Sequence, residues 1–135
     1  GLTVPFLGGD GWDGLEGYAT ADQLKDAYFC ANYAKGSNTE FESAYKEKYG
    51  EDYPNGFAPL GYDAAMTVVY GLQAAEDAGL EAGTDEYKQA VIDAIASGTI
   101  DGITGTFTFD EHHNPVKQTA ILCFDGATPV LKEMF

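Results

Sequence analysis

The chain has 135 residues, 44% of them hydrophobic, which is enough to build a packed core of ordinary domain size. It carries 7 basic and 22 acidic residues, a formal net charge of −15, and a field of this sign repels nucleic acids and anionic membrane surfaces. No apolar run is long enough to cross a bilayer, and the chain opens without a signal-peptide pattern. Because it opens almost directly on a strand-like segment, we expect it to be part of a longer protein.

The first part of the chain predicts strands separated by a weakly helical segment. Residues 4–7 form a short apolar run that ends at two glycines, as is typical of a buried strand leading into a tight turn. Residues 13–25 have weak helical character that glycines interrupt. Residues 27–33 are aromatic and strand-like, and a Lys-Gly-Ser sequence follows them.

Three helices are predicted by their caps and their periodicity. Ser37 and Glu40 fit a capping box at the start of the first helix, and Gly50 is its expected stop. Residues 60–78 are small or apolar around most of the helical circumference, which predicts a long helix buried on several sides. Thr84 is the expected N-cap of the third helix.

The last part of the chain predicts β-structure. Residues 104–109 alternate threonine and phenylalanine with period two, and residues 110–115 form a polar turn. Residues 119–124 predict a further strand, and the Asp125-Gly126 pair after it is a hairpin signal. Early alternation of strands and helices followed by an antiparallel tail predicts an α/β fold with a mixed sheet.

The two cysteines each lie within an apolar stretch. We expect Cys30 and Cys123 to be buried free thiols that act as small hydrophobic residues. A disulfide between them stays open for an oxidising compartment, because a sequence gives neither distance nor connectivity. Neither cysteine belongs to a C-x-x-C pair, so no redox or zinc motif is indicated.

Four sequence blocks, in order and with suitable spacing, resemble one known family. They are Pro5 to Trp12 (PFLGGDGW), Phe41 to Gly50 (FESAYKEKYG), Gly61 to Ala65 (GYDAA) and Gly102 to Asp110 (GITGTFTFD). Together they are similar to the later part of the leucine/isoleucine/valine-type periplasmic binding proteins, the type I solute-binding proteins of ABC transporters. The resemblance covers essentially the whole chain.

The resemblance implies a type I periplasmic-binding-protein-like α/β fold, to which this chain contributes pieces of two three-layer lobes as a C-terminal fragment. Residues 1–53 would belong to lobe 2, residues 54–114, with two long helices, to lobe 1, and residues 115–135 would return to lobe 2. The family encloses a solute between its lobes and delivers it to an ABC permease in the membrane. The resemblance thus implies a periplasmic or extracellular protein, lipid-anchored or secreted, that is not an enzyme and uses no cofactor. A fragment of this kind could also self-associate to complete its sheets.

Asp10 is the first candidate for ligand binding. It follows the predicted strand 4–7, so its carboxylate is expected at the carboxyl end of the sheet, where ligands of open α/β sheets bind. There it can accept charge-assisted hydrogen bonds from an α-ammonium group, the role that the resemblance also implies for an acid at this position. The alternative is a turn aspartate that bonds its own backbone.

Two aromatic residues are further candidates. Tyr62, at the expected start of the long helix, can offer a ring face and a hydroxyl to a ligand, and the resemblance implies an aromatic residue near this position. Its alternative role is that of a core tyrosine. Trp12 is a candidate to pack over the ligand, although a single tryptophan is often simply buried. Asp63 is interpreted as a helix-start charge that interacts with the helix dipole.

Other chemistries are only weakly indicated. Residues 9–14 satisfy G-x-G-x-x-G after a strand, but Asp10 and Asp13 would repel a pyrophosphate, so we do not expect nucleotide binding. The loop 110–114 gathers acidic residues and two histidines, but adjacent histidines in a turn point apart, and we expect no metal there. A hydrolase built on Asp10 and His112 lacks a nucleophile.

The sequence therefore predicts an extracytoplasmic solute-binding protein of an ABC importer that binds an amino acid, with branched-chain amino acids as the family default. A sensory or regulatory domain of the same fold, which binds amides or amino acids for a partner protein, stays open as an alternative. So does a fragment without independent activity. The identity of the solute is not determined by these residues.

Overall fold

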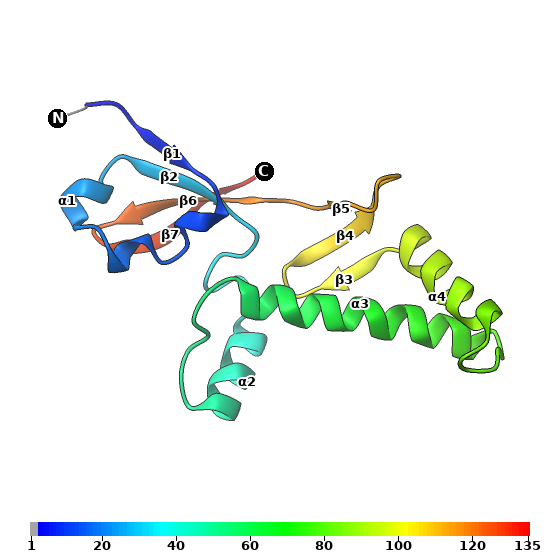
Figure 1. Cartoon of the computed structure of the whole chain (residues 1–135). Helices are drawn as coiled ribbons and strands as arrows, with labels where there is room; N and C mark the ends of the chain where they lie inside the picture. The colour runs from blue at the N-terminus through cyan, green and yellow to red at the C-terminus, as the bar shows by residue number, and fades with distance from the viewer. Residues whose placement is uncertain (1–2) are drawn as a thin grey trace. The chain divides into compact units, whose positions relative to one another are not determined.

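The computed structural model describes residues 3–135, so Gly1 and Leu2, with which the predicted lobe 2 segment opens, lie outside the described residues. The described chain divides into two compact units. Unit 1 comprises residues 3–60 and 118–135, and unit 2 comprises Gly61–Lys117; Figure 1 labels their elements. The sequence predicts the two transitions after residues 53 and 114, whereas the contacts place them after residues 60 and 117. The assignment of these units to lobes 2 and 1 stays a prediction.

Unit 1 is built on a mixed sheet. Its strands are β1 (Phe6–Gly8), β2 (Ala27–Ala31), β6 (Ala120–Asp125) and β7 (Thr128–Met134), in the order β1-β2-β6-β7. β1 and β2 are parallel, whereas the β2–β6 and β6–β7 pairs are antiparallel. Between β1 and β2 the chain forms two 3-10 turns and a short helix, η1 (Asp10–Trp12), η2 (Leu15–Gly17) and α1 (Ala21–Leu24), which Figure 1 shows beside the sheet. The predicted α/β fold with a mixed sheet is confirmed.

The core of unit 1 lies on the face of the sheet that α1 covers. Alternation along β2 buries Ala27, Phe29 and Ala31 on this face. The rings of Phe29 and Phe124 stack with their centroids 5.5 Å apart, and Leu24 of α1 is only 1% exposed. Burial of one such large side chain stabilises the folded state by about 1.5–3 kcal/mol, so this cluster fixes which face of the sheet is inside.

The two cysteines lie on adjacent antiparallel strands, and both are free thiols. Cys30 is exposed and Cys123 is half-buried, so the prediction that both are buried is wrong for Cys30. The reason is the alternation of a strand: burial of Phe29 turns the next side chain to the opposite face. An apolar segment does not reveal which of its two faces will be covered.

Helix α2 (Thr39–Tyr49) follows β2 in unit 1, and its caps are local. The N-cap is Asn38, whose side-chain oxygen accepts the N–H of Phe41 at 3.0 Å, so the predicted Ser37 capping box is wrong by one residue. The predicted stop is confirmed, because Gly50 has φ 77° and donates its N–H to the carbonyl of Lys46 at 2.8 Å. This left-handed conformation favours glycine, which has no Cβ.

Unit 2 contains one complete helix, most of a second helix and a small antiparallel sheet. Its elements are α3 (Phe57–Asp77, with the first turn in unit 1), α4 (Asp85–Ser97), β3 (Ile100–Gly102), β4 (Gly105–Phe109) and β5 (Pro115–Val116). The strand order is β3-β4-β5, and β3 was not expected from the sequence. Helix α3 begins three residues before the predicted residue 60, because Asn55 accepts the N–H of Phe57 with its side-chain oxygen at 3.1 Å. Pro59 is tolerated in the first turn, where its missing N–H costs little.

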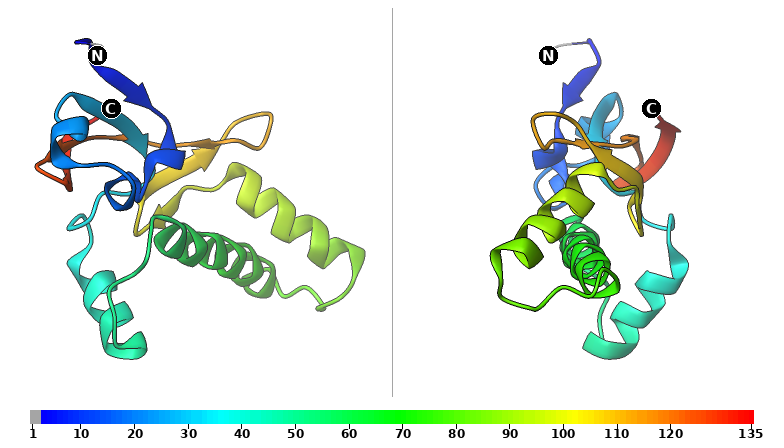
Figure 2. Two further views of the ribbon diagram at one scale, coloured as in Figure 1. Left: turned by 60° about the vertical axis from the view of Figure 1, so that its left-hand side comes forward. Right: turned by 90° about the vertical axis from the view of Figure 1, so that its right-hand side faces the viewer.

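One stripe of α3 packs inside unit 2. Its buried positions are Asp63, Thr67, Gly71 and Ala75, which recur every four residues and therefore lie on one face. Gly71 lets α4 approach, since a Cβ there would lie 2.8 Å from a side-chain carbon of Ile95; Figure 2 shows the two helices side by side. Away from the stripe, five large apolar side chains are 40–51% exposed: Met66, Val68, Val69, Tyr70 and Leu72. The prediction of a helix buried on several sides is therefore wrong within the described chain.

No helix within residues 3–135 has both the length and the apolar character to cross a membrane.

Asp63 is a buried anchor, and its interpretation as a helix-start charge is wrong. The side chain is 3% exposed in the second turn of α3. One carboxylate oxygen accepts the N–H of Ile103 at 2.7 Å, and the other accepts the N–H of Thr104 at 2.9 Å and its hydroxyl at 2.5 Å. Lys117 donates a hydrogen bond to the same hydroxyl, and burial lowers the pKa of this lysine. Gly102 is required beside the carboxylate, because a Cβ there would lie 2.5 Å from an Asp63 oxygen.

We expect Thr104→Val to lower the free energy of unfolding by about 2 kcal/mol, because it removes a donor to a buried carboxylate and the acceptor of Lys117. Urea unfolding of the full-length protein measures this loss. Thr106→Val is the matched control, since its hydroxyl donates to Asp101 at an exposed position, and its expected cost is below about 0.5 kcal/mol. Equal costs for the two variants would contradict an anchoring role of Asp63.

Candidate functional site

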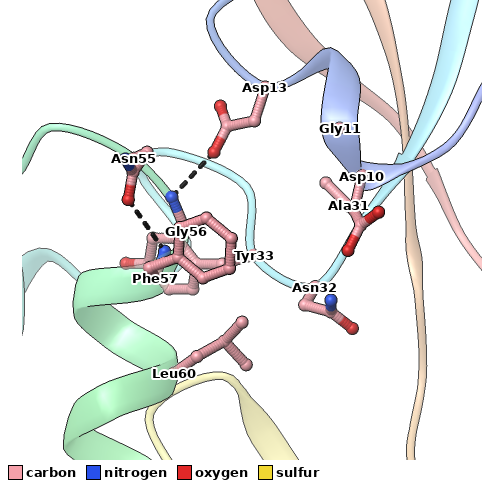
Figure 3. Close-up of a pocket in the computed structure, with 10 residues that line it drawn as sticks. All are labelled: Asp10, Gly11, Asp13, Ala31, Asn32, Tyr33, Asn55, Gly56, Phe57 and Leu60. Carbon is pink, nitrogen blue, oxygen red and sulfur yellow. Dashed lines mark hydrogen bonds between the residues drawn. The ribbon is translucent and has the colours of Figure 1, made fainter.

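A pocket of about 180 Å³ in unit 1 lies beside the carboxyl ends of β1 and β2. Parallel strands bring these ends to one edge of the sheet, which is where ligands of α/β folds bind. The wall is contributed by the loop after β1, the end of β2 and the first turn of α3. Figure 3 shows the lining residues: Asp10, Gly11, Asp13, Ala31, Asn32, Tyr33, Asn55, Gly56, Phe57 and Leu60.

Asp10 and Asn32 supply the uncommitted polar groups of the pocket. Asp10 begins η1 directly after the glycine pair, and Asn32 follows the last residue of β2. Figure 3 shows the Asp10 carboxylate and the Asn32 amide on the same side of the pocket. Within residues 3–135 neither side chain takes part in an intramolecular hydrogen bond, so the alternative of a turn aspartate bonded to its own backbone gains no support. Both groups are available to a ligand.

Asp13 is committed to the chain itself. One oxygen of its carboxylate accepts the N–H of Gly56 at 2.7 Å, immediately before α3. Gly56 approaches closely, since a Cβ there would lie 3.3 Å from that oxygen. The negative charge at the start of the helix also interacts favourably with the helix dipole. Asp13 therefore fixes the loop after β1 to the first turn of α3, the two walls of the pocket (Figure 3).

Tyr33 supports the floor of the pocket through an interaction with α2. Its hydroxyl donates to the carboxylate of Glu42 at 2.7 Å and accepts the N–H of Asn38 at 3.0 Å. The same Glu42 oxygen accepts the N–H of Gly36, also at 2.7 Å. Burial and then the hydrogen bond to Glu42 raise the pKa of the Tyr33 phenol above its usual range, because both disfavour the phenolate. The rings of Tyr33 and Tyr53 meet edge to face, with their centroids 5.7 Å apart.

Trp12 belongs to the core beneath the site. Its indole packs against the buried cluster of unit 1 and covers Gly8, where a Cβ would lie 2.1 Å from the ring. It is not among the residues that line the pocket, which favours the alternative of a buried hydrophobic residue over a ligand contact. The Gly8-Gly9 pair thus has two different halves: Gly8 makes room for the indole, whereas a Cβ at Gly9 would meet nothing within 4 Å.

Tyr62 lies in unit 2, in the second turn of α3, and its side chain is 46% exposed. The sequence predicts Tyr62 at the start of the helix, but α3 begins at Phe57. Tyr62 is also not a lining residue of the pocket in unit 1. Phe57 does line the pocket, as does Asn32, and both were missed. The available signals were an aromatic residue directly after Pro-Asn-Gly and a polar residue directly after a strand. A ligand-binding role for Tyr62 stays a prediction.

The loop after β4 is held by its own aspartate. Asp110 accepts the backbone N–H groups of His112 and Asn114, each at 2.8 Å. The hydrogen bonds from Asn114 lower the pKa of Asp110. In the part of the chain that the structure describes, no group of three or more His, Cys, Asp or Glu residues is placed to hold a metal ion.

The family model of the periplasmic binding proteins matches residues 1–127, so the chain belongs to the periplasmic binding protein family. A search of curated proteins gave no match. The resemblance inferred from the four sequence blocks is confirmed. The matching family and structures are solute-binding proteins, not enzymes, in agreement with the prediction that this protein is not an enzyme.

Solved structures share this fold. The branched-chain amino acid transporter substrate-binding protein of Streptococcus pneumoniae, in complex with isoleucine, is 26% identical with a TM-score of 0.68, over 96% of this chain and 36% of that chain. A leucine-binding protein of Thermotoga maritima is 20% identical with a TM-score of 0.67, over 98% and 37%. An ABC transporter solute-binding protein of R. palustris, in complex with benzoate, is 21% identical with a TM-score of 0.68, over 96% and 35%. The chain therefore spans little more than a third of the length of these proteins.

We expect Gly8→Ala to displace the Trp12 indole and to lower the free energy of unfolding by about 1–3 kcal/mol, as overpacking does. Tryptophan emission should shift to longer wavelength, with Trp12→Phe as the reference that identifies the signal. Gly9→Ala is the matched control, because its backbone is extended (φ −93°, ψ −171°) and the site has room. Unchanged emission in Gly8→Ala would contradict the placement of the indole.

The raised pKa of Tyr33 predicts a loss of stability in alkali. An unfolded tyrosine ionises near pH 10, and the folded pKa lies higher. The neutral phenol therefore contributes stability fully below about pH 10, and this contribution is lost as the pH rises above that value. We expect Tyr33→Phe to flatten the dependence of the unfolding free energy on pH between about 9.5 and 11. Tyr18→Phe, at a side chain 92% exposed, should leave the slope unchanged; equal slopes for all three proteins would contradict the argument.

Proposed function

We propose that this chain is part of an extracytoplasmic solute-binding protein of an ABC importer that binds an amino acid, with Asp10 holding the α-ammonium group. The single observation that carries the proposal is the pair of uncommitted polar side chains, Asp10 and Asn32, at the carboxyl ends of two parallel strands. An ammonium group has three donors and no acceptor, so a free carboxylate is its strongest neutral-pH partner. The amide oxygen of Asn32 can take a second of these donors.

The rest of the pocket suits a small solute with an apolar part. Ala31, Phe57 and Leu60 contribute apolar groups to the same wall that carries Asp10. Pockets for small ligands combine such surfaces with a few polar groups that fix orientation. The isoleucine complex of the Streptococcus pneumoniae protein and the name of the Thermotoga maritima protein support a branched-chain amino acid as the solute.

Groups for the solute carboxylate would lie outside this wall. The chain spans 35–37% of the three described structures, which leaves room for such groups in the remainder of a longer protein. Tyr62 of α3 remains a proposed contact, since its partly exposed ring and hydroxyl can serve a ligand. Trp12 is proposed to support the loop from below and not to touch the solute.

The proposed partner is an ABC permease, and the proposed location is the periplasm or the cell exterior, through a lipid anchor or secretion. A sensory or regulatory amide- or amino-acid-binding protein of the same fold would use the same pocket and differ in its partner. The isolated chain could self-associate or lack binding of its own. In either case the isolated chain would fail to bind the solute, whereas the full-length protein would bind it.

The experiment is a thermal-shift screen of the full-length protein against amino acids and short amides. Ligand at about a hundredfold over its dissociation constant adds about 2.7 kcal/mol to the stability of the folded state. We expect one amino-acid class to raise the melting temperature and Asp10→Asn to abolish the shift. Asp125→Asn is the matched control, since it removes the same charge from an exposed hairpin position in the same unit and keeps an Asn-Gly turn. If no amino acid or amide shifts the wild type, the assignment of the ligand is wrong.

A further inference from the structure

We infer that Asp13 makes the pocket selective against anions, because it adds negative charge to the wall and holds the N–H through which a ligand carboxylate would otherwise bind at the start of α3. The inference rests on the proposed function, because it concerns the same pocket, and it names the class of ligand that this wall rejects. It is carried by two observations, the hydrogen bonds at the start of α3 and the charges of the lining residues.

The start of α3 has no N–H group left for a ligand anion. A helix N-terminus is ordinarily a ready site for a carboxylate, because its first N–H groups lack partners within the helix. Here the N–H of Gly56 donates to Asp13 at 2.7 Å, that of Phe57 to the side chain of Asn55 at 3.1 Å, and that of Ala58 to the Asn55 carbonyl at 3.3 Å. Pro59 has no N–H. A ligand carboxylate would have to displace Asp13 from this position.

The charges on the wall act in the same direction. Among the described residues that line the pocket, Asp10 and Asp13 are the two carboxylates, and Tyr33 is the other ionisable residue. This lining contains no Lys, Arg or His. Lys35 shares a neighbouring cavity with Asp13, but its ammonium pairs with Asp52 at 2.9 Å. An anion at this wall meets two negative charges, whereas an ammonium group is attracted by both. Rejection of a competing ligand by unpaired charge is a common basis of specificity.

Asp10 and Asp13 thus have separate roles. Asp10 offers free acceptor positions to the solute, and Asp13 holds the N–H that an anion would otherwise use. The variant Asp13→Asn separates charge from position, because its amide oxygen can still accept the Gly56 N–H while the negative charge is gone. If Asp13 acted only by holding Gly56, Asp13→Asn would leave the preference between cations and anions unchanged.

The test compares benzylamine with benzoate, which share a ring and differ in the sign of their charge, by isothermal titration calorimetry on the full-length protein near neutral pH. We expect wild type to prefer benzylamine, and Asp13→Asn to raise the affinity ratio of benzoate to benzylamine by about fivefold or more. Asp125→Asn controls for net charge and should leave the ratio within about twofold. A ratio that does not change in Asp13→Asn, or that changes equally in Asp125→Asn, overturns the inference, as does the absence of binding of both probes to every protein.

Salt gives a second measurement that needs no variant. Between about 0.05 and 0.5 M NaCl the preference of the wild type for benzylamine should shrink, because salt screens charges at an open wall; a preference independent of salt overturns the inference. Failure of the proposed function is distinguishable, since it appears as the absence of leucine, isoleucine or valine binding by the wild type. The ratio of the two ring probes is judged independently of that result.

Discussion

Parallel pairing of β1 with β2 is the constraint on which the candidate site depends. The register joins Phe6 to Ala27 and Gly8 to Phe29, so both strands end at the same edge of the sheet. A parallel pair cannot be closed by a tight hairpin, and the chain between these strands therefore makes a crossover through η1, η2 and α1. The start of this crossover carries Asp10 and Asp13 to the edge where β2 ends. Without the parallel pair, the loop after β1 and the end of β2 would not meet at one edge of the sheet.

The strong negative charge of the chain has a structural use. Buried or positioned carboxylates repeatedly accept backbone N–H groups where the chain turns: Asp13 holds Gly56, Glu42 holds Gly36, Asp63 holds Ile103 and Thr104, and Asp110 holds His112 and Asn114. Charge-assisted bonds of this kind are stronger than neutral ones and fix loops that have little apolar surface. Asp10, in the pocket wall, differs from these carboxylates, because within residues 3–135 its oxygens accept no hydrogen bond from the chain. That difference is what makes it the best candidate for the solute.

Glycines set where the chain can come close to these groups. Gly102 makes room for the carboxylate of Asp63, and Gly8 makes room for the indole of Trp12. In both places the missing Cβ allows a side chain to cover the backbone, so a glycine-rich loop becomes a packed one. The sequence block with the most glycines was therefore a mixture of pocket-facing and core-facing positions. Local composition alone could not separate Asp10 from Trp12.

The sequence by itself determined the class of fold, the stop of α2 at Gly50 and the position of Asp10 after a strand. It also determined the N-cap of α4 at Thr84, whose hydroxyl accepts the N–H of Tyr87 at 3.2 Å. Helix caps and strand alternation are local, so a few neighbouring residues suffice to specify them. The family also followed from the sequence, since four blocks in order carry that information without any contact being known. Which face of β2 is covered, and hence the exposure of Cys30, could not follow from a segment that is apolar on both faces.

Only the tertiary structure decided which carboxylates are committed and which are free. Asp13 meets Gly56 and Asp63 meets Ile103 across 43 and 40 positions of sequence, and no local pattern encodes a contact at that separation. The same holds for Asn32 and Phe57, which line the pocket with Asp10 although they belong to different elements. A hydrogen bond needs two groups at one place in space, and the chain brings them there only after its sheets and helices have packed.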